Sequence, residues 1–314
     1  MTEHILVTGG AGFIMSHFVD LVIDRGYKVT MIDAMFEGSN IDNFKHHLNN
    51  DMFTFIRGDL CNPYLLRQLN DLRIDYIVHG AAQSHVDRSI SNTWSFVQSN
   101  IIGTHNILEW MLTNPYIKKF VYVNTDEVYG SIEHGYASEG DPLAPSSPYS
   151  ASKASAGLLV YSYYITYGLP VTQTYCSNNF GPRQDIEKLI PKFITLLHQK
   201  QSVPLMKSVS NVRDWIYVLD HCEALFQVML NGLPGIGYNI AGDNEKTNIA
   251  ITHLLLNIFG LDDSYIMIVP DRLGHDKRYG ISSKKIHQEL QWSPQWSFPN
   301  ALQHTVDWYV SQDN

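Results

Sequence analysis

Two short clusters in the middle of the chain carry groups that can move protons. Thr125, Asp126 and Glu127 follow an apolar run, and Tyr149 and Lys153 lie a short distance downstream. Tyr149 and Lys153 are four positions apart in a helix-like stretch, so they share one face of the expected helix. A nearby ammonium lowers the pKa of a phenol from about 10. The phenolate can then accept a proton from a hydroxyl while hydride leaves, which indicates alcohol oxidation; a surface helix pair is the alternative.

The two adjacent carboxylates exceed what such an oxidation requires. Asp126 and Glu127 repel each other, so one of them is expected to have a raised pKa, and the pair can then act as acid and base. Next to a sugar ketone at C4, a base can remove the C5 hydrogen while an acid protonates the departing C6 hydroxyl. These residues therefore predict loss of water. The alternative is that both carboxylates cap the following segment.

A glycine-rich turn joins the first expected strand, residues 4–8, to a helix-like stretch at 13–24. Glycines there let backbone N–H groups and a helix N-terminus meet a pyrophosphate. Asp33 ends the second expected strand, where a carboxylate binds the adenosine ribose and disfavours a 2′-phosphate. The pattern predicts NAD as the cofactor, against the alternative of an ordinary turn. The positive nicotinamide of NAD would add to Lys153 in lowering the Tyr149 pKa. The candidate cofactor-binding residues are Gly9, Gly12, Phe13, Ile14, Asp33, Asp59, Leu60, Ala81, Ala82, Asn100, Tyr149 and Lys153.

Three positions around this cofactor site fit less simply. Asp59 could instead cap a turn, and Asn100 could be a buried polar residue that ties down a loop. A third glycine is expected three residues after Gly12, but the chain has Met15 there. A methionine at this place should push the helix outward or turn toward the cofactor. We therefore expect NAD to bind more loosely than it would with glycine.

Strand-like and helix-like stretches alternate through the first part of the chain. Further β-like runs lie at 27–33, 53–57, 76–80, 120–124 and 171–175, separated by helix-like stretches at 62–73, 92–113 and 149–167. Such alternation predicts an α/β fold of the Rossmann type, with a doubly wound parallel sheet covered on both faces. We expect residues 1–180 to form the NAD-binding domain, with returning segments near 215–241. Residues 181–314 should form mainly a smaller C-terminal substrate-binding region.

The composition of the whole chain limits the classes of partner. The 314 residues carry a formal net charge of −9 and no local basic stripe, which argues against a nucleic-acid partner. The three cysteines are far apart and lack metal-ligand spacing, so no metal is expected and the thiols should be reduced. No apolar run approaches the length of a membrane span, and the N-terminus lacks a signal-peptide pattern. We expect a cytoplasmic protein without a membrane partner.

Several segments together resemble the dTDP-glucose 4,6-dehydratases, which belong to the extended short-chain dehydrogenase/reductases. They are Thr-Asp-Glu-Val-Tyr-Gly (125–130), Ser-Pro-Tyr-Ser-Ala-Ser-Lys-Ala (147–154), Ala-Ala-Gln-Ser-His-Val-Asp-Arg-Ser (81–89), Cys-Ser-Asn-Asn-Phe-Gly-Pro (176–182), Asn-Val-Arg-Asp-Trp (211–215) and Gly-His-Asp-Lys-Arg-Tyr (274–279). The resemblance runs in register from about residue 3 to about residue 310. The Tyr-x-x-x-Lys pair alone would indicate only the superfamily.

This resemblance implies a reaction and a role for each group. Tyr149 would be the base for oxidation at C4, Glu127 would remove the C5 proton, and Asp126 would protonate the leaving hydroxyl. Hydride would return to C6 to give a 4-keto-6-deoxy sugar, with NAD as a tightly held prosthetic group. The resemblance also implies a homodimer that pairs the stretches 92–113 and 149–167. The implied nucleotide-sugar-binding residues are Ser84, His85, Asp87, Asn178, Lys192, Arg213, Asn248, Arg278 and Tyr279.

Some alternatives stay open at the level of the sequence. Residues 207–210 replace the Gly-Asp-Gly-type turn usual in the family, which leaves UDP-glucose as an alternative to dTDP-glucose. Asn124 stands where serine is usual, and His85 could be a core histidine. A nucleotide-sugar 4-epimerase would lack the pair Asp126 and Glu127. A non-catalytic nucleotide-sugar binding protein would not need the proton-handling residues.

Overall fold

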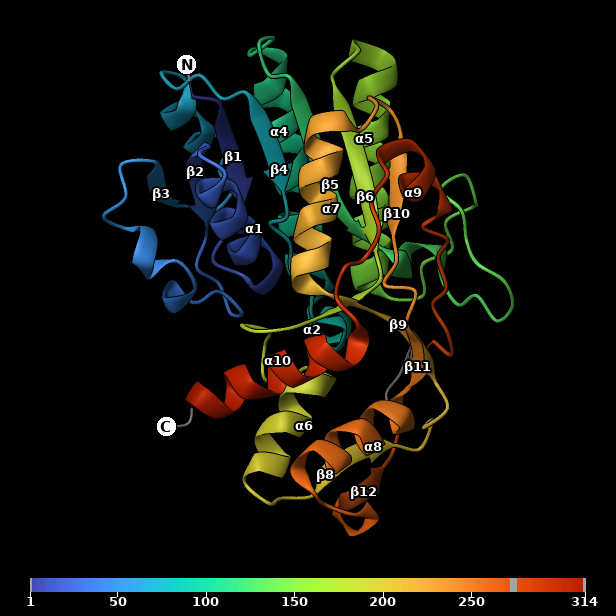
Figure 1. Cartoon of the computed structure of the whole chain (residues 1–314). Coiled ribbons are helices and arrows are strands. Elements are labelled where there is room, and N and C mark those ends of the chain that lie inside the picture. Colours follow the sequence, from blue (N-terminus) through green and yellow to red (C-terminus); the bar gives the residue numbers. More distant parts are fainter. Residues whose placement is uncertain (1, 272–275, 313–314) are drawn as a thin grey trace.

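A seven-stranded parallel sheet dominates the computed structural model, which describes residues 2–271 and 276–312 (Figure 1). The strands lie in the order β10-β6-β5-β4-β1-β2-β3. They are β1 (His4–Thr8), β2 (Lys28–Asp33), β3 (Phe53–Arg57), β4 (Tyr76–His79), β5 (Lys119–Thr125), β6 (Val171–Cys176) and β10 (Gly237–Ile240). Strands β1, β4 and β5 are buried along their whole length. Such burial is expected for apolar strands that lie between two layers of helices.

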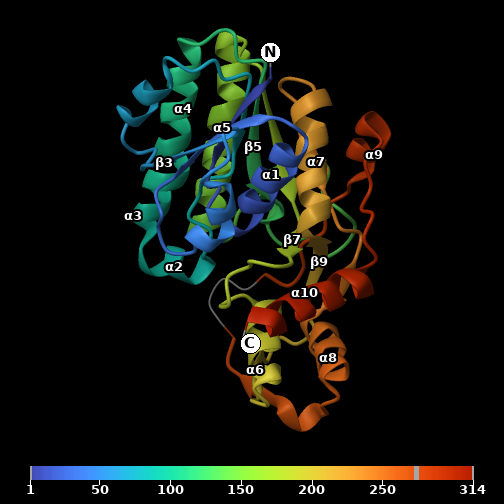
Figure 2. The ribbon, with the colours of Figure 1, turned by 60° about the vertical axis from the view of Figure 1, so that its left-hand side comes forward.

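Helices cover both faces of this sheet (Figures 1 and 2). On one face, α1 (Phe13–Asp24) packs beside α7 (Val218–Asn231), and on the other α4 (Gly103–Leu112) packs beside α5 (Pro148–Tyr167). Alternate residues of β1 point to the two layers: Ile5 and Val7 belong to the core beneath α1 and α7, and Leu6 to the core beneath α4 and α5. The prediction of a doubly wound α/β sheet of the Rossmann type is confirmed.

A smaller region lies beyond the carboxyl ends of the strands (Figure 1, lower part). Its sheets are β11-β9-β7 and β12-β8. The strands are β7 (Asn178–Phe180), β8 (Val203–Met206), β9 (Val212–Tyr217), β11 (Glu245–Thr247) and β12 (Ile266–Val269), and the helices are α6 (Leu189–His198), α8 (Asn248–Phe259) and α10 (Phe298–Gln312). The shorter α2 (Val86–Ser91), α3 (Thr93–Phe96) and α9 (Lys284–Leu290) complete the α-helices of the described residues.

Some elements differ from those expected from the sequence. The run at 215–218 does not return to the main sheet, because β9 pairs with β7 and β11 and the chain then enters α7 directly. The stretch 62–73 contains only the 3₁₀ helix Leu65–Leu69. The stretch 92–113 is divided by a π-helical segment, Val97–Ile102, that contains the buried Asn100. Hydropathy patterns mark where apolar residues lie, but not which partner strand or helix geometry they adopt.

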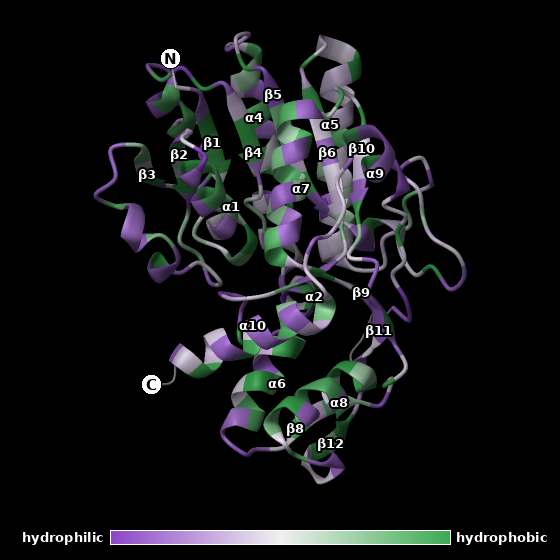
Figure 3. Cartoon of the chain, viewed as in Figure 1, coloured by the Kyte–Doolittle hydropathy of each residue, from purple (hydrophilic) through white to green (hydrophobic). Residues whose placement is uncertain are grey.

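Hydrophobic residues concentrate in the strands of the main sheet and in the sides of the helices that face it (Figure 3). No helix within residues 2–271 and 276–312 combines the length and the apolar character needed to cross a membrane.

Candidate active site

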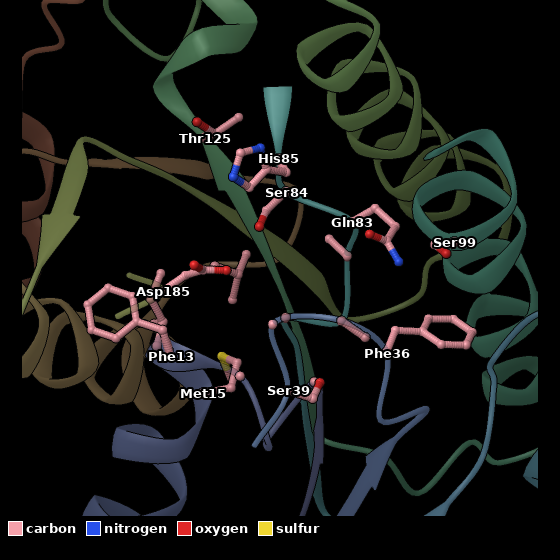
Figure 4. Close-up of a pocket in the computed structure, with 18 of the residues that line it drawn as sticks. Phe13, Met15, Phe36, Ser39, Gln83, Ser84, His85, Ser99, Thr125 and Asp185 are labelled. Carbon is pink, nitrogen blue, oxygen red and sulfur yellow. The ribbon is translucent and has the colours of Figure 1, made fainter. Parts of the chain in front are cut away.

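A cavity follows the carboxyl ends of the parallel strands, the edge at which doubly wound sheets bind ligands. Its walls come from the turn after β1, the segments after β2 and β4, the end of β5, the first turns of α5 and the segment after β6. In Figure 4, Met15 and Ser39 lie on one side of the cavity, and Ser84 and Thr125 on the other. The predicted residues that line it are Gly9, Gly12, Phe13, Ile14, Asp33, Asp59, Leu60, Ala81, Ala82, Ser84, His85, Thr125, Asp126, Glu127, Tyr149, Lys153 and Asn178.

The glycine turn gives this cavity a backbone floor. Gly9 has a φ of 75°, and a Cβ there would lie 2.7 Å from Ala81 Cα, so a side chain at this position is excluded twice. Gly12 is the N-cap of α1 and has no side chain to cover the N–H groups of the first turn. A helix N-terminus approached over bare backbone suits a pyrophosphate. The turn therefore fits a dinucleotide.

Asp33 holds this turn in place from the end of β2. Its carboxylate accepts hydrogen bonds from the backbone N–H of Ala11 (3.0 Å), the N–H of Met35 (2.7 Å) and the hydroxyl of Ser39 (2.9 Å). These contacts fix a negative charge on the cavity wall, where it would repel a 2′-phosphate and could accept from ribose hydroxyls. The position agrees with the preference for NAD predicted from the sequence.

Of the two other uncertain cofactor candidates, one lines the cavity and one does not. Asp59 lines the cavity and also accepts from the N–H of Cys61 (2.9 Å), so the turn interpretation and the cavity position both hold. Asn100 is 1% exposed and lies behind the cavity wall. It accepts from the N–H of Gln83 (2.7 Å) and donates to the hydroxyl of Ser152 (2.8 Å). Asn100 therefore ties a loop to α5, as its alternative interpretation proposed.

The end of β5 turns Thr125, Asp126 and Glu127 into the cavity. The Thr125 hydroxyl caps the 3₁₀ helix Asp126–Tyr129 by accepting from the N–H of Glu127 (3.4 Å), and it donates to Asp126 Oδ1 (3.3 Å). Both carboxylates thus stand in the first turn of a short helix and also line the cavity. The capping alternative describes the local backbone, but the residue that caps the helix is Thr125.

The surroundings of Asp126 favour the protonated form of its carboxyl. Burial, followed by the charge of Glu127, raises the pKa of Asp126 well above its usual range, and the nearby Arg213 only partly opposes this. The Oδ2 atom of Asp126 is buried and has no hydrogen-bond partner within the described part of the chain. A neutral carboxyl with an unsatisfied oxygen beside an open cavity is suited to give a proton to a bound ligand.

Tyr149 and Lys153 come from the first turns of α5. A capping box between Ser147 and Ser150, with Pro148 at the first helical position, starts that helix sharply. Lys153 donates to the carbonyl of Val123 (2.7 Å), which holds its ammonium at the end of β5. The spacing of Tyr149 and Lys153 therefore brings both side chains to the cavity.

The expected lowering of the Tyr149 pKa depends on Lys153 together with the positive nicotinamide of NAD, and the protein alone does not produce it. Burial, then the charge of Glu127, raises the pKa of Tyr149 well above its usual value, although the Thr125 hydroxyl opposes the shift. Burial also lowers the pKa of Lys153 to about 7, so near neutral pH its stabilising charge is only partly present. Burial and the charge of Glu127 therefore set the direction of the Tyr149 pKa shift in the protein alone.

A buried chain of hydrogen bonds leads from the cofactor side to α5. His79 lies between the hydroxyls of Thr8 (2.7 Å) and Thr104 (2.9 Å), and burial lowers its pKa to about 3, so it is neutral. Since Thr104 donates to the carbonyl of Asn100 (2.6 Å), it must accept from His79 Nε2–H, and Thr8 must donate to Nδ1.

From the side chain of Asn100, further hydrogen bonds lead to α5. Asn100 donates to Ser152, and Ser152 donates to the carbonyl of Tyr149 (2.7 Å). At the other end, Thr8 accepts from the N–H of Ala81 (3.2 Å) on the cavity wall. Every donor and acceptor has one direction, so the chain fixes the start of α5 relative to β1 and β4.

The predicted substrate residues are only partly brought together. Ser84, His85 and Asn178 line the cavity, and His85 Nε2 lies 2.8 Å from the half-exposed carboxylate of Glu187, so His85 is not a core residue. The remaining candidates, which are not in the cavity lining, are Asp87, Lys192, Arg213, Asn248, Arg278 and Tyr279. Within the segment that resembles the family at 274–279, Gly274 and His275 lie outside the described residues.

Both predicted phosphate-binding arginines are engaged by the protein. Arg213 lies 4.4 Å from the centre of the Tyr279 ring and donates to the carbonyl of Asp276 (2.8 Å). Arg278 donates to two carbonyls of the 132–135 segment and pairs with Glu245 (2.6 Å). Neither guanidinium presents an open fork to the cavity in this state. The sequence could not show these partners, because they come from distant segments.

Several cavity residues were missed by the sequence prediction: Gly80, which meets Met15, Cys176 at the end of β6, and Lys188. Burial raises the pKa of the Cys176 thiol to about 12, so it is not a nucleophile. Met15 itself carried a signal, as a departure from the glycine pattern. The missed residues have ordinary residue types, and their importance comes from their position.

Comparison with known proteins agrees with this geometry. Residues 6–305 match the family described as GDP-mannose 4,6 dehydratase. A dTDP-glucose 4,6-dehydratase from an Actinoplanes species is 44% identical over 312 residues, with 97% of each chain covered. The crystal structure of dTDP-glucose 4,6-dehydratase from Bacillus anthracis in complex with NAD has a TM-score of 0.93 and 41% identity, covering 99% of this chain and 98% of that one. The UDP-glucose 4-epimerase of Thermotoga maritima, at 28% identity, has a TM-score of 0.92 and covers 99% of this chain and all (100%) of that one. The fold is thus shared with epimerases, and sequence identity is higher with the dehydratases.

Proposed function

The chain belongs to the nucleotide-sugar 4,6-dehydratase family, and from this premise we propose that it converts dTDP-glucose to dTDP-4-keto-6-deoxyglucose with NAD as a retained cofactor. The reaction removes water, so the enzyme would be a hydro-lyase. The observation that carries the proposal is the buried carboxyl of Asp126, with its raised pKa and unpartnered Oδ2, next to Glu127. An oxidoreductase or an epimerase has no use for such a pair.

The residues of the cavity fit NAD. The turn at Gly9 and Gly12 would receive the pyrophosphate, Asp33 the adenosine ribose, and Tyr149 with Lys153 the nicotinamide ribose. Bound NAD supplies the acceptor for the hydride of C4 and the donor of the hydride to C6. The turn supports this assignment because it has no side chain at Gly9, so the pyrophosphate can approach the backbone closely. A Cβ at Gly9 would lie against Ala81.

Tyr149 is the proposed base for the C4 hydroxyl. Burial keeps its proton in place, so it becomes a base only when positive charge is brought beside it. The carbonyl of Val123 holds the Lys153 ammonium, which would supply part of that positive charge. The Thr125 hydroxyl can hydrogen-bond both to the substrate and to Tyr149. A base whose pKa falls only when the site is filled avoids carrying a buried charge in the empty site.

Asp126 and Glu127 are the proposed acid and base of the water loss. Glu127 takes the C5 proton, which the C4 ketone makes acidic, and Asp126 gives its proton to the C6 hydroxyl. The C5–C6 double bond forms as the C6–O bond breaks, so one water leaves. When C6 is reduced, the proton on Glu127 returns to C5. Tyr149 releases the proton of the C4 hydroxyl to solvent and Asp126 regains one from solvent, so the cycle closes with the loss of one water. The raised pKa of Asp126 favours its protonated form at the start of each cycle.

One experiment tests this function against its alternatives. The protein is incubated separately with dTDP-glucose and UDP-glucose, and the mass of each sugar nucleotide is followed. We expect dTDP-glucose to lose the mass of one water. Loss of one water from UDP-glucose alone would contradict dTDP-glucose as the substrate and identify UDP-glucose instead. An isomer of unchanged mass would contradict dehydration in favour of epimerisation, and no reaction with either would contradict both substrates.

We further propose a homodimer that pairs α4 and α5. These helices expose a set of large apolar side chains beyond what a free surface needs. The exposed residues are Leu112, Leu158, Tyr161, Ile165 and Tyr167. Leu158→Lys should therefore yield monomers in light scattering after gel filtration, and wild-type protein should elute as a dimer. A monomeric wild-type protein would contradict this proposal.

The state of the cysteines supports a reducing location. Cys61, Cys176 and Cys222 are free thiols, and two of the three are buried. We propose the cytoplasm, where such thiols stay reduced.

A further inference from the structure

Met15 and Gly80 form a matched pair at the floor of the cavity. A Cβ added to Gly80 would lie 2.4 Å from Met15 Cγ and 2.5 Å from Met15 Sδ. The next atom in its way, the Thr8 carbonyl oxygen, would be 3.4 Å distant, which is an ordinary contact. The backbone of Gly80 does not have the positive φ that restricts other positions to glycine. Glycine is therefore needed at position 80 because of the Met15 side chain, not because of the backbone.

The pair lies at the point where the order of the strands reverses within the sheet. The chain builds β1, β2 and β3 toward one edge and β4, β5 and β6 toward the other, so the switch point falls between β1 and β4. Ligands of doubly wound sheets cross the crevice at this point. Met15 starts from α1, which follows β1, and reaches Gly80, which follows β4. Its thioether therefore spans the floor of the crevice.

Met15 is buried in this position and packed into the core. It is 3% exposed and belongs to the core between α1 and the sheet, while it still lines the cavity. In Figure 4 its sulfur lies within the cavity, near the end of α1 that carries Phe13. Of the two outcomes expected for a methionine here, the side chain has turned toward the cofactor side.

We propose that the Met15 thioether forms the floor on which the middle of the dinucleotide rests, and that the absence of a side chain at Gly80 leaves the space for Met15. The inference rests on the proposed use of NAD and adds a residue that sets its affinity. Removing Met15 should leave a gap under the cofactor and weaken binding. Restoring a side chain at position 80 should be harmful only while Met15 is present.

A double-mutant cycle tests this pair. Wild type, Met15→Ala, Gly80→Ala and the double variant are stripped of NAD. NAD affinity is then measured by isothermal titration, and thermal unfolding is recorded without NAD. Met111→Ala is the matched control, because Met111 is an equally buried helical methionine outside the cavity.

We expect Met15→Ala to weaken NAD binding by about tenfold, the loss expected for a missing thioether contact. Gly80→Ala should weaken binding and lower the melting temperature, because its Cβ displaces Met15. In the Met15→Ala background the same change should add no further loss. Met111→Ala should lower the melting temperature and leave NAD affinity unchanged.

Three results would oppose the inference in different ways. Unchanged or tighter NAD binding in Met15→Ala would overturn the role of the thioether. Equal losses from Gly80→Ala in both backgrounds would overturn the packing of the pair. A wild-type chain that takes up no NAD would overturn the proposed function, and with it the cofactor role of Met15; the melting temperatures would still report on the packing.

Discussion

Asp126→Asn should have opposite effects on catalysis and on stability. Burial of Asp126 favours the protonated form that catalysis needs, but it destabilises the folded protein once the carboxyl is ionised. Asparagine keeps the shape of the side chain and removes its acidic proton. As general acid catalysis contributes about 10²–10⁴-fold, we expect the rate of water loss to fall by about this factor. Oxidation at C4 uses Tyr149 and Thr125, so reduction of bound NAD by substrate should persist in the variant.

The stability of the same variant should change with pH in a defined direction. The folded pKa of Asp126 is raised above its usual value of 3.8. Its contribution to stability is therefore complete below the unfolded pKa and is lost as pH rises through the folded pKa. Each unit of the shift corresponds to about 1.4 kcal/mol. Above the folded pKa, Asp126→Asn should consequently be more stable than wild type, and the advantage should disappear in acid.

Asp220→Asn provides the matched control for this prediction. Asp220 is also buried and its pKa is also raised by burial, but both of its oxygens accept backbone N–H groups, from Gln295 (2.9 Å) and Trp296 (3.1 Å). The amide can replace only one of these acceptors, so Asp220→Asn should lose stability and keep its rate. Single-turnover absorbance of reduced NAD, product mass and urea unfolding at several pH values measure these effects. Water loss at the wild-type rate in Asp126→Asn, or a stability difference independent of pH, would refute the reasoning.

Two further variants test neighbouring parts of the site. Glu127→Gln should still reduce bound NAD in the presence of dTDP-glucose, but the substrate should keep its mass, since the base for C5 is gone; dehydration at the normal rate would show that Glu127 has another role. His79→Phe should remove both bonds to the threonines and cost about 1–3 kcal/mol for each buried group left unsatisfied, measured by urea unfolding. It should also lower kcat more than it raises KM, because Tyr149 loses its fixed position. His79→Gln should recover part of kcat. Equal effects on kcat and KM would favour a purely structural role for His79.

Much of the site could be predicted because its residues are neighbours in sequence or end consecutive strands. Parallel strands bring their carboxyl ends to one edge, so Gly9, Asp33 and Thr125 had to meet once the alternation of strands and helices was recognised. The four-residue spacing placed Tyr149 and Lys153 on one face of α5. Local rules were sufficient for these positions.

The remaining features depend on contacts between distant segments. The strand at 215–218 joins a second sheet because β7 and β11 are available as partners, and a hydrophobic run does not encode its partner. Arg213 and Arg278 are occupied by carbonyls from segments far away in the chain. The pKa of Tyr149 rises mainly because of burial, which is a property of the whole fold.

Met15 shows how such a distant contact can reverse the sign of a prediction. Judged against the glycine pattern alone, a methionine should crowd the turn, and its removal should tighten NAD binding. Gly80 lies 65 positions away (80 minus 15) and changes this conclusion, because the missing side chain provides the room that Met15 occupies. A residue that fills existing space is part of the binding surface, and its removal creates a gap. The affinity of Met15→Ala for NAD therefore decides between the two interpretations by its direction alone.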